Sequence, residues 1–143
     1  MLVRILSNQI QQYEDVINET IEKTIPEAQP QLLTKLYEEL LFGIAQCWVS
    51  TRQGKFEAII LTKIEENTAC GAKCCVIISG YAPNGTNSAS FYEGWKDISK
   101  FAIANDCDRI SLYTNNPEIE KYMHMFDLIW DARYYQVRLN REN

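Results

Sequence analysis

The spacing of the apolar residues changes near Gly43, and this change constrains the fold more than any other feature of the sequence. Before Gly43, apolar residues recur at intervals of three and four through residues 7–23 and again through residues 32–41, which is the pattern of helices with one buried face. After Gly43, the residues follow the shorter period of strands. The sequence therefore predicts two helices followed by a sheet.

The predicted sheet begins with a hairpin. Residues 44–51 and 55–65 are strand-like, and Arg52-Gln53-Gly54 joins them as a short turn. The second of these strands carries apolar residues on both faces, which is typical of a strand near the middle of a sheet. A third strand, continuous and apolar, is predicted over residues 73–79.

The second half of the chain alternates helices and strands. Its predicted segments are a long irregular stretch over 80–93, a helix from 95 to 105, a strand over 109–114, a helix over 116–126 and a last strand over 130–139. The predicted order is α-α-β-β-β-α-β-α-β, an α/β fold with a mixed sheet and helices on both faces. With 143 residues, the chain is expected to form one domain over residues 1–143.

The overall charge and hydropathy limit the kinds of partner. The net charge of −5 and the pI near 4.9 argue against a nucleic-acid-binding protein, because clustered Lys and Arg side chains grip a phosphate backbone. The apolar runs are far shorter than the roughly 20 residues that cross a bilayer. Residues 1–10 contain no apolar stretch of signal-peptide length. We therefore expect a cytoplasmic protein with no membrane or nucleic-acid partner.

The five cysteines raise the question of disulfides and metal binding. Without an export signal, thiols are expected to stay reduced. Cys74 and Cys75 are adjacent on a predicted strand, so their side chains point to opposite faces and cannot easily bind one ion together. His124 has no partner at ligand spacing. We expect buried free thiols and no metal.

Three stretches in the middle of the chain carry a family resemblance. Residues 48–64 form the predicted hairpin with Gly54 at its turn, residues 98–114 a helix and the strand after it, and residues 116–126 a helix bearing Tyr122. In this order they resemble the central hairpin, the core helix and the following segment of the GNAT (Gcn5-related N-acetyltransferase) fold. The small acidic chain also resembles proteins of bacteriophages, which would place it in a host cytoplasm or a virion.

The resemblance implies a site for acetyl-CoA or another acyl-CoA. In the family, the pyrophosphate of this cofactor rests on a Gln/Arg-x-x-Gly-x-Gly/Ala loop that opens the core helix, where backbone N–H groups and the helix dipole favour negative charge. Counting back from Ala102 places this loop near residues 87–92. The acyl carbonyl would lie near a backbone N–H of residues 78–80. The expected cofactor-binding residues are Ile78, Gly80, Asn87, Ser88, Ser90 and Asn116.

Two residues are expected to carry the chemistry that the resemblance implies. Tyr122 is the candidate general acid, because a phenol near the thiolate leaving group can protonate it. The alternative for Tyr122 is an ordinary aromatic residue on a buried helix face. Glu57 is the candidate base that deprotonates the amine, with Glu65 and Glu66 as further candidates. Asn116 can likewise be a helix cap instead of a cofactor ligand.

Two functions therefore stay open. The first is an N-acyltransferase that moves an acyl group from acyl-CoA to an amine substrate. The second is a GNAT-like module without catalytic activity that binds protein partners or has a structural role, because residues 87–92 contain no Arg or Lys, and Phe91 and Tyr92 add bulk there. These two rings, with Tyr81 and Trp95, either bind a partner or fill the cofactor cleft. The sequence permits a homodimer without requiring one.

Overall fold

The computed structural model describes residues 2–25, 29–68, 70–112, 114, 116–126, 128 and 139. Its strands are β1 (Leu2–Ile5), β2 (Ala45–Arg52), β3 (Lys55–Glu66), β4 (Lys73–Tyr81) and β5 (Arg109–Leu112). Its helices are the 3-10 helix η1 (Ser7–Tyr13) and the α-helices α1 (Glu14–Thr24), α2 (Pro30–Leu41), α3 (Ser88–Ala104) and α4 (Pro117–Met125). None of the helices in these ranges is long and apolar enough to cross a membrane.

The described strands form one sheet in the order β1-β2-β3-β4-β5. The first three pairings are antiparallel, and β4 pairs with β5 in parallel. In the turn between β2 and β3, Gln53 and Gly54 have φ angles of +53° and +75°. Positive φ at both central positions is typical of a type I′ turn, whose twist matches that of the flanking strands. The hairpin and the mixed sheet confirm the predicted fold.

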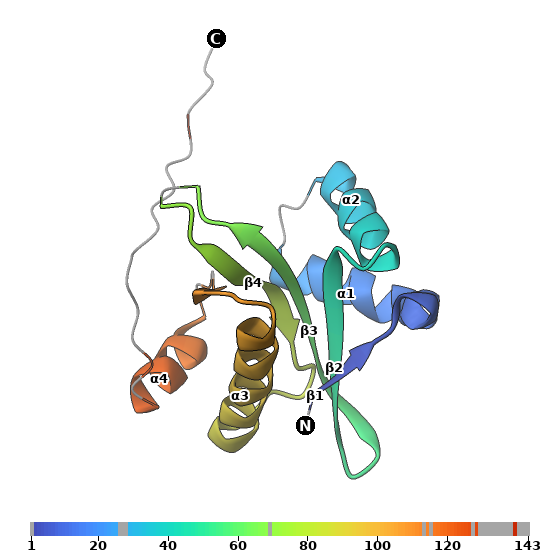
Figure 1. Ribbon diagram of the computed structural model, residues 1–143. Helices are drawn as coiled ribbons and strands as arrows, with labels where there is room; N and C mark the ends of the chain where they lie inside the picture. The colour runs from blue at the N-terminus through green and yellow to red at the C-terminus, as the bar shows by residue number, and fades with distance from the viewer. Residues whose placement is uncertain are drawn as a thin grey trace.

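The helices cover both faces of the sheet, with α1 and α2 on one side and α3 and α4 on the other (Figure 1). On the first face, Ile17 of α1 and Leu40 of α2 belong to the same buried cluster as Leu61 of β3. On the second face, Ile98 of α3 packs in a cluster with Trp48 of β2. Each face therefore has its own apolar core, and the central strands are covered on both sides.

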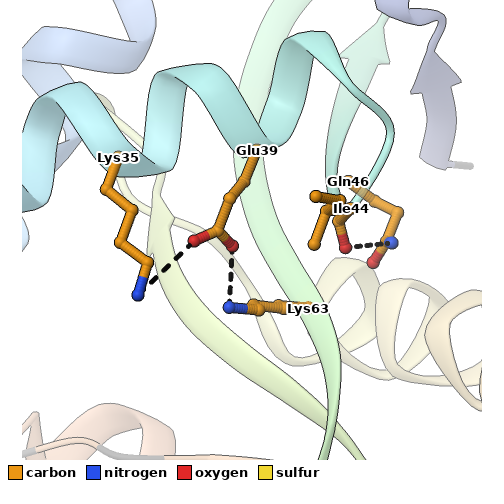
Figure 2. Close-up of polar contacts among 5 residues, drawn as sticks. All are labelled: Lys35, Glu39, Ile44, Gln46 and Lys63. Carbon is orange, nitrogen blue, oxygen red and sulfur yellow. Dashed lines mark hydrogen bonds and ion pairs between the residues drawn. The ribbon is translucent and has the colours of Figure 1, made fainter.

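A half-buried ion pair fastens α2 to the sheet. Glu39 of α2 lies 2.8 Å from Lys63 of β3 and 3.9 Å from Lys35, one turn earlier on its own helix (Figure 2). The side chain of Glu39 is 12% exposed and that of Lys63 is 24% exposed, whereas that of Lys35 is 71% exposed. In the same view, Gln46 donates a side-chain N–H to the carbonyl of Ile44 at 3.2 Å. Of the two contacts that Glu39 makes with lysines, the one with Lys63 joins the helix to the sheet and involves the less exposed side chain.

The N-terminal strand β1 is missing from the predicted order. It pairs antiparallel with β2, from Leu2 opposite Ser50 to Ile5 opposite Cys47. A strand of four residues is too short to give a clear alternation, and its existence depends on pairing with a distant segment. The first predicted helix, over residues 7–23, forms two elements in the structure, the 3-10 helix η1 followed by the α-helix α1. The predicted last strand, over residues 130–139, falls almost wholly outside the described residues.

Helix α3 begins earlier than predicted. The stretch predicted to be irregular, residues 80–93, includes the end of β4 at Tyr81 and the first turns of α3 from Ser88 onward. Asn87 caps the helix by accepting the N–H of Ser90 at 2.8 Å. The small polar residues of the first turn hide this helix start, because they lack the apolar spacing from which helices are predicted.

Candidate functional site

Strand β4 contains a β-bulge in its pairing with β3. Ile77 and Ser79 pair with consecutive residues of β3, so Ile78 between them is the extra residue of the bulge. Ile77 opposite Leu112 is the last described pair between β4 and β5, directly before this bulge. A bulge bends its strand and interrupts regular pairing. Among the described residues, β4 beyond Ile77 therefore has no strand partner on its β5 side, and the predicted residues Ile78 and Gly80 lie on this segment.

The loop between β4 and α3 spans residues 82–87. Gly85 in this loop has a φ of +78°, a left-handed conformation that glycine adopts without the steric cost of a side chain. The stretch that the sequence predicted to be the phosphate loop, residues 87–92, is instead the cap and first turn of α3. The bulky aromatic side chains of that stretch therefore belong to the helix and not to the loop.

Three of the predicted cofactor-binding residues lie together at the start of α3. The N–H groups in the first turn of a helix have no intrahelical acceptor. The side chain of Asn87 accepts the backbone N–H of Ser90. The backbone N–H groups of Ser88 and Ala89 come before it, at the positive end of the helix dipole. This arrangement is suited to an anion.

Glu57 reaches the same turn of α3 from a second bulge. Its two neighbours in β3 pair with consecutive residues of β2, so Glu57 is the extra residue. One carboxylate oxygen accepts the hydroxyl proton of Ser90 at 3.1 Å, and the other accepts that of Ser50 at 3.0 Å. Arg52, at the end of β2, donates to the hydroxyl oxygen of Ser90 at 3.3 Å. The hairpin is thus bound to the first turn of α3.

Glu57, the predicted base, lies at the start of α3. Leu61, which pairs with Ser79 beside the first bulge, is four residues along β3 from Glu57. At about 3.3 Å per residue this is roughly 13 Å. The structure therefore brings Glu57 to the start of α3 and not to the bulge of β4.

Tyr122, the predicted acid, joins α4 to the loop before α3. Its side chain is buried, and its hydroxyl donates to the carbonyl of Thr86 at 3.3 Å. Its ring lies 5.2 Å from that of Phe91, which stacks on Trp95 at 6.1 Å. Burial raises the pKa of Tyr122, and the carboxylate of Glu118 raises this pKa further. The phenol is therefore protonated at neutral pH and able to donate.

A groove of about 440 Å³ runs beside the first turns of α3. It is lined by Ser88, Ala89, Tyr92, Glu93, Lys96 and Phe126. The rings of Tyr92 and Phe126 stack at 4.4 Å, and Nζ of Lys96 lies 5.1 Å from the centre of the Tyr92 ring. The groove thus combines aromatic surface with one cation, Lys96, and one carboxylate, Glu93, next to the positive end of a helix.

Asn116 lies at the start of α4 and caps that helix. Its side-chain oxygen accepts the N–H of Glu118 at 3.0 Å, and its own N–H donates to the hydroxyl of Thr114 at 3.0 Å. The capping role that the sequence allowed is confirmed. A role of Asn116 in cofactor binding stays a prediction.

On the opposite face of β4, helix α1 ends beside the Ile78 bulge. Thr24, the last residue of α1, shares a hydrogen bond with the hydroxyl of Ser79. Thr24 donates its own proton to the carbonyl of Thr20 at 2.7 Å, so Ser79 is the donor to Thr24. The negative end of the α1 dipole therefore lies at the bulge. The helix also carries four acidic residues and one basic residue, namely Glu14, Asp15, Glu19, Glu22 and Lys23.

Sequence reasoning missed Arg52, Lys96 and Thr24. Lys96 could have been predicted from the sequence, because a helix that begins at Ser88 places this cation two turns after its start. Arg52 and Thr24 come to the site only through tertiary contacts, which no local pattern contains.

Within the described ranges, no group of three or more His, Cys, Asp or Glu side chains could hold a metal ion. All five cysteines lie in those ranges, and none forms a disulfide. Burial raises the pKa of Cys47 to about 12 and that of Cys75 to about 11. Such thiols are packing residues and poor nucleophiles at neutral pH.

Comparison with known proteins gives matches in structure and not in sequence. No protein-family model matches the chain, and no curated protein matches it either. Among solved structures, a probable acetyltransferase has a TM-score of 0.72 at 8% identity, with 99% of each chain covered. A predicted acetyltransferase with acetyl-CoA from Clostridium acetobutylicum has a TM-score of 0.70 at 10% identity, covering 96% of this chain and 95% of its own.

An aminoglycoside N-acetyltransferase, AAC(6')-Iy, also matches, in a complex with a bisubstrate analogue of CoA and an acetylated neamine. Its TM-score is 0.72 at 10% identity, with 98% of this chain and 97% of that chain covered. At such identities the likeness establishes the fold alone. The order of the strands and helices agrees with these neighbours: the chain has the fold of the GNAT acetyltransferases.

Proposed function

We propose that the protein binds an acyl-CoA and transfers its acyl group to an amine. One arrangement carries this proposal: the last described β4–β5 pair, Ile77 with Leu112, stands directly before the Ile78 bulge, a glycine-containing loop and the start of α3. An extended ligand arm can pair with the free edge of a strand, while an anion at the helix start is favoured by the dipole. The strand edge and the helix start follow one another as the parts of an acyl-CoA do. The thioester and the extended arm next to it would lie along the strand, and the diphosphate would lie at the start of the helix.

The residues at the strand fit the acyl end of such a ligand. The backbone from Ile78 to Gly80 supplies N–H and C=O groups beyond the last described β4–β5 pair. In this proposal, one of these N–H groups holds the acyl carbonyl and stabilises the negative charge that develops on its oxygen. When bound, the acyl-CoA supplies an activated thioester.

The residues at the start of α3 fit the diphosphate end. Gly85 supplies the loop backbone, and Asn87 and Ser88 stand at the positive end of the helix. Lys96 and the stacked rings of Tyr92 and Phe126 line the adjacent groove, which suits an adenine ring together with a phosphate. A solved neighbour with the same fold holds acetyl-CoA, which supports this assignment.

Tyr122 fits the role of general acid. Its raised pKa keeps the phenol protonated at neutral pH, and its hydroxyl lies at the loop that joins β4 to α3. In this proposal the neutral amine attacks the thioester carbon, the C–N bond forms as the C–S bond breaks, Tyr122 gives its proton to the departing thiolate, and the proton lost from the amine nitrogen passes to solvent. The amine would approach from the α1 side, where the hydroxyls of Thr24 and Ser79 and the acidic helix favour a cationic group.

Isothermal titration with acetyl-CoA tests the proposal, with thermal shift as a second readout, because a ligand of the folded state raises the melting temperature by mass action. We expect micromolar binding, weakened roughly tenfold by Lys96→Glu, which reverses a charge beside the phosphates. Lys100→Glu is the matched control: it is an exposed residue one turn further along the same helix and should bind as the parent does. No heat and no shift at millimolar acetyl-CoA would contradict the proposal and leave a non-catalytic binding module.

A further inference from the structure

The bulge at Glu57 turns a carboxylate toward the start of α3. Side chains alternate between the faces of a sheet, so Glu57 in a regular strand would share a face with Ile59, which is buried in the cluster under α1 and α2. Instead its carboxylate binds Ser90 of α3 and Ser50. A bulge is a known means of re-aiming a side chain, and here it moves a negative charge to the α3 side.

The contacts of Ser90 are complete without a ligand. Its backbone N–H is taken by the Asn87 cap, and its hydroxyl proton by Glu57. The hydroxyl oxygen also accepts from Arg52. A carboxylate in this place compensates the positive end of the helix dipole, as an anionic ligand would. The first turn of α3 is therefore already supplied with an anion from within the chain.

We infer that Glu57 is an internal competitor for the anion site at the start of α3, so that its contact with Ser90 opposes the binding of a diphosphate. The inference rests on the proposed function, because it concerns regulation of the same site. A diphosphate brings further negative charge to a turn that already holds a carboxylate, and like charges at this range repel. Binding then requires Glu57 to leave Ser90, which frees the hydroxyl proton of Ser90 for the diphosphate and leaves Arg52 beside the hydroxyl oxygen.

This role differs from that of the base which the sequence predicted. A base must reach the proton that it removes, directly or through one water. Glu57 lies roughly 13 Å along β3 from the residue opposite Ser79, and both of its oxygens are engaged by serine hydroxyls. A competitor needs only proximity to the helix start, which these contacts provide.

Titration of the full chain with acetyl-CoA at low salt tests the inference. Glu57→Gln removes the charge and keeps the size of the side chain, and we expect it to tighten acetyl-CoA binding roughly tenfold. The difference should shrink in 1 M salt, where the Debye length is about 3 Å. Glu66→Gln, an exposed residue at the other end of the same strand, is the matched control and should leave the affinity unchanged.

The outcomes separate this inference from the proposed function. If the parent protein binds acetyl-CoA and Glu57→Gln binds it equally or more weakly, Glu57 is not a competitor and the proposed function stands. If only Glu57→Gln binds, the inference holds, and the proposed function is wrong for the parent protein, in which Glu57 prevents binding. If neither binds, both are wrong. Ser90→Ala removes the anchor of Glu57 while leaving its charge, and should tighten binding less than Glu57→Gln does; this variant serves if Glu57→Gln fails to fold.

Discussion

The hydroxyl of Tyr122 donates to the backbone carbonyl of Thr86 at 3.3 Å, so that helix α4 holds the loop before α3 through one side chain. Tyr122→Phe removes this bond and the only proton that the side chain could give. We expect turnover of acetyl-CoA with an amine to fall roughly a hundredfold, the usual scale of general acid catalysis, while acetyl-CoA affinity changes little. Steady-state kinetics and calorimetry on the same preparation check this. Unchanged turnover in a folded variant would show that Tyr122 is only a packing residue.

Gly85 and Gly71 form a matched pair for testing the loop. Both have left-handed φ angles, +78° and +74°, and a Cβ added at either would meet nothing within 4 Å. Alanine at either position should therefore cost about 1 kcal/mol of folding free energy through backbone strain alone. Only Gly85→Ala should also weaken acetyl-CoA binding, because Gly71 lies in the turn between β3 and β4. Chemical denaturation and calorimetry measure the two effects, and an equal loss of affinity in both variants would contradict the placement of the loop.

The ion pair between Glu39 and Lys63 should matter more to stability than the pair between Glu39 and Lys35. Lys63→Ala leaves the half-buried Glu39 carboxylate without its nearer partner, which should cost about 1–3 kcal/mol. Lys35→Ala removes a long contact from an exposed side chain and should cost less than about 0.5 kcal/mol. Urea denaturation of the two variants gives the comparison. Equal costs would show that α2 is held by its apolar face alone.

Stability should fall as the pH rises above about 9. Burial raises the pKa of Cys47 to about 12 and that of Cys75 to about 11 in the folded protein, against an ordinary thiol value of 9.0. Above pH 9 the unfolded chain therefore binds fewer protons than the folded one, and each thiol lowers the free energy of unfolding by up to about 1.4 kcal/mol per pH unit. Below pH 9 this contribution is constant.

Urea denaturation between pH 8 and pH 10.5 measures that slope. Cys47→Ala should flatten it by the share of one thiol, with a lower starting stability because a small cavity is left. The raised pKa values of Tyr37 and Tyr122 act in the same direction at still higher pH. A free energy of unfolding that stays constant over this range would show that the two thiols are reached by water.

Much of the architecture could be predicted from the sequence, because it is encoded locally. The hairpin follows from Gln53-Gly54 and the alternation on either side, and α4 from an Asn-Pro start. The β1 strand could not be predicted, since its four residues become a strand only by pairing with β2. The start of α3 was placed too late, because its first turn is fixed by the Asn87 cap and not by apolar spacing.

The candidate site was predictable only in part. Tyr122 and Asn87 lie on elements whose type was predicted, and the structure brings both to the loop before α3. The bulges at Glu57 and Ile78 depend on the register between neighbouring strands, and no single strand contains that information. The direction of the Glu57 side chain, which decides its chemistry, therefore could not be predicted from its position in the sequence.

The β1 strand also braces the helix that carries the candidate anion site. The N–H of Leu2 donates to the carboxylate of Asp97 at 2.9 Å, and the guanidinium of Arg4 lies 5.5 Å from the ring centre of Phe101. Both partners are on α3. Leu2 also pairs with Ser50, whose hydroxyl binds Glu57. An addition or a deletion at residues 2–5 would thus disturb the candidate anion site, so binding constants should be measured on a chain in which these residues are unchanged and unobstructed.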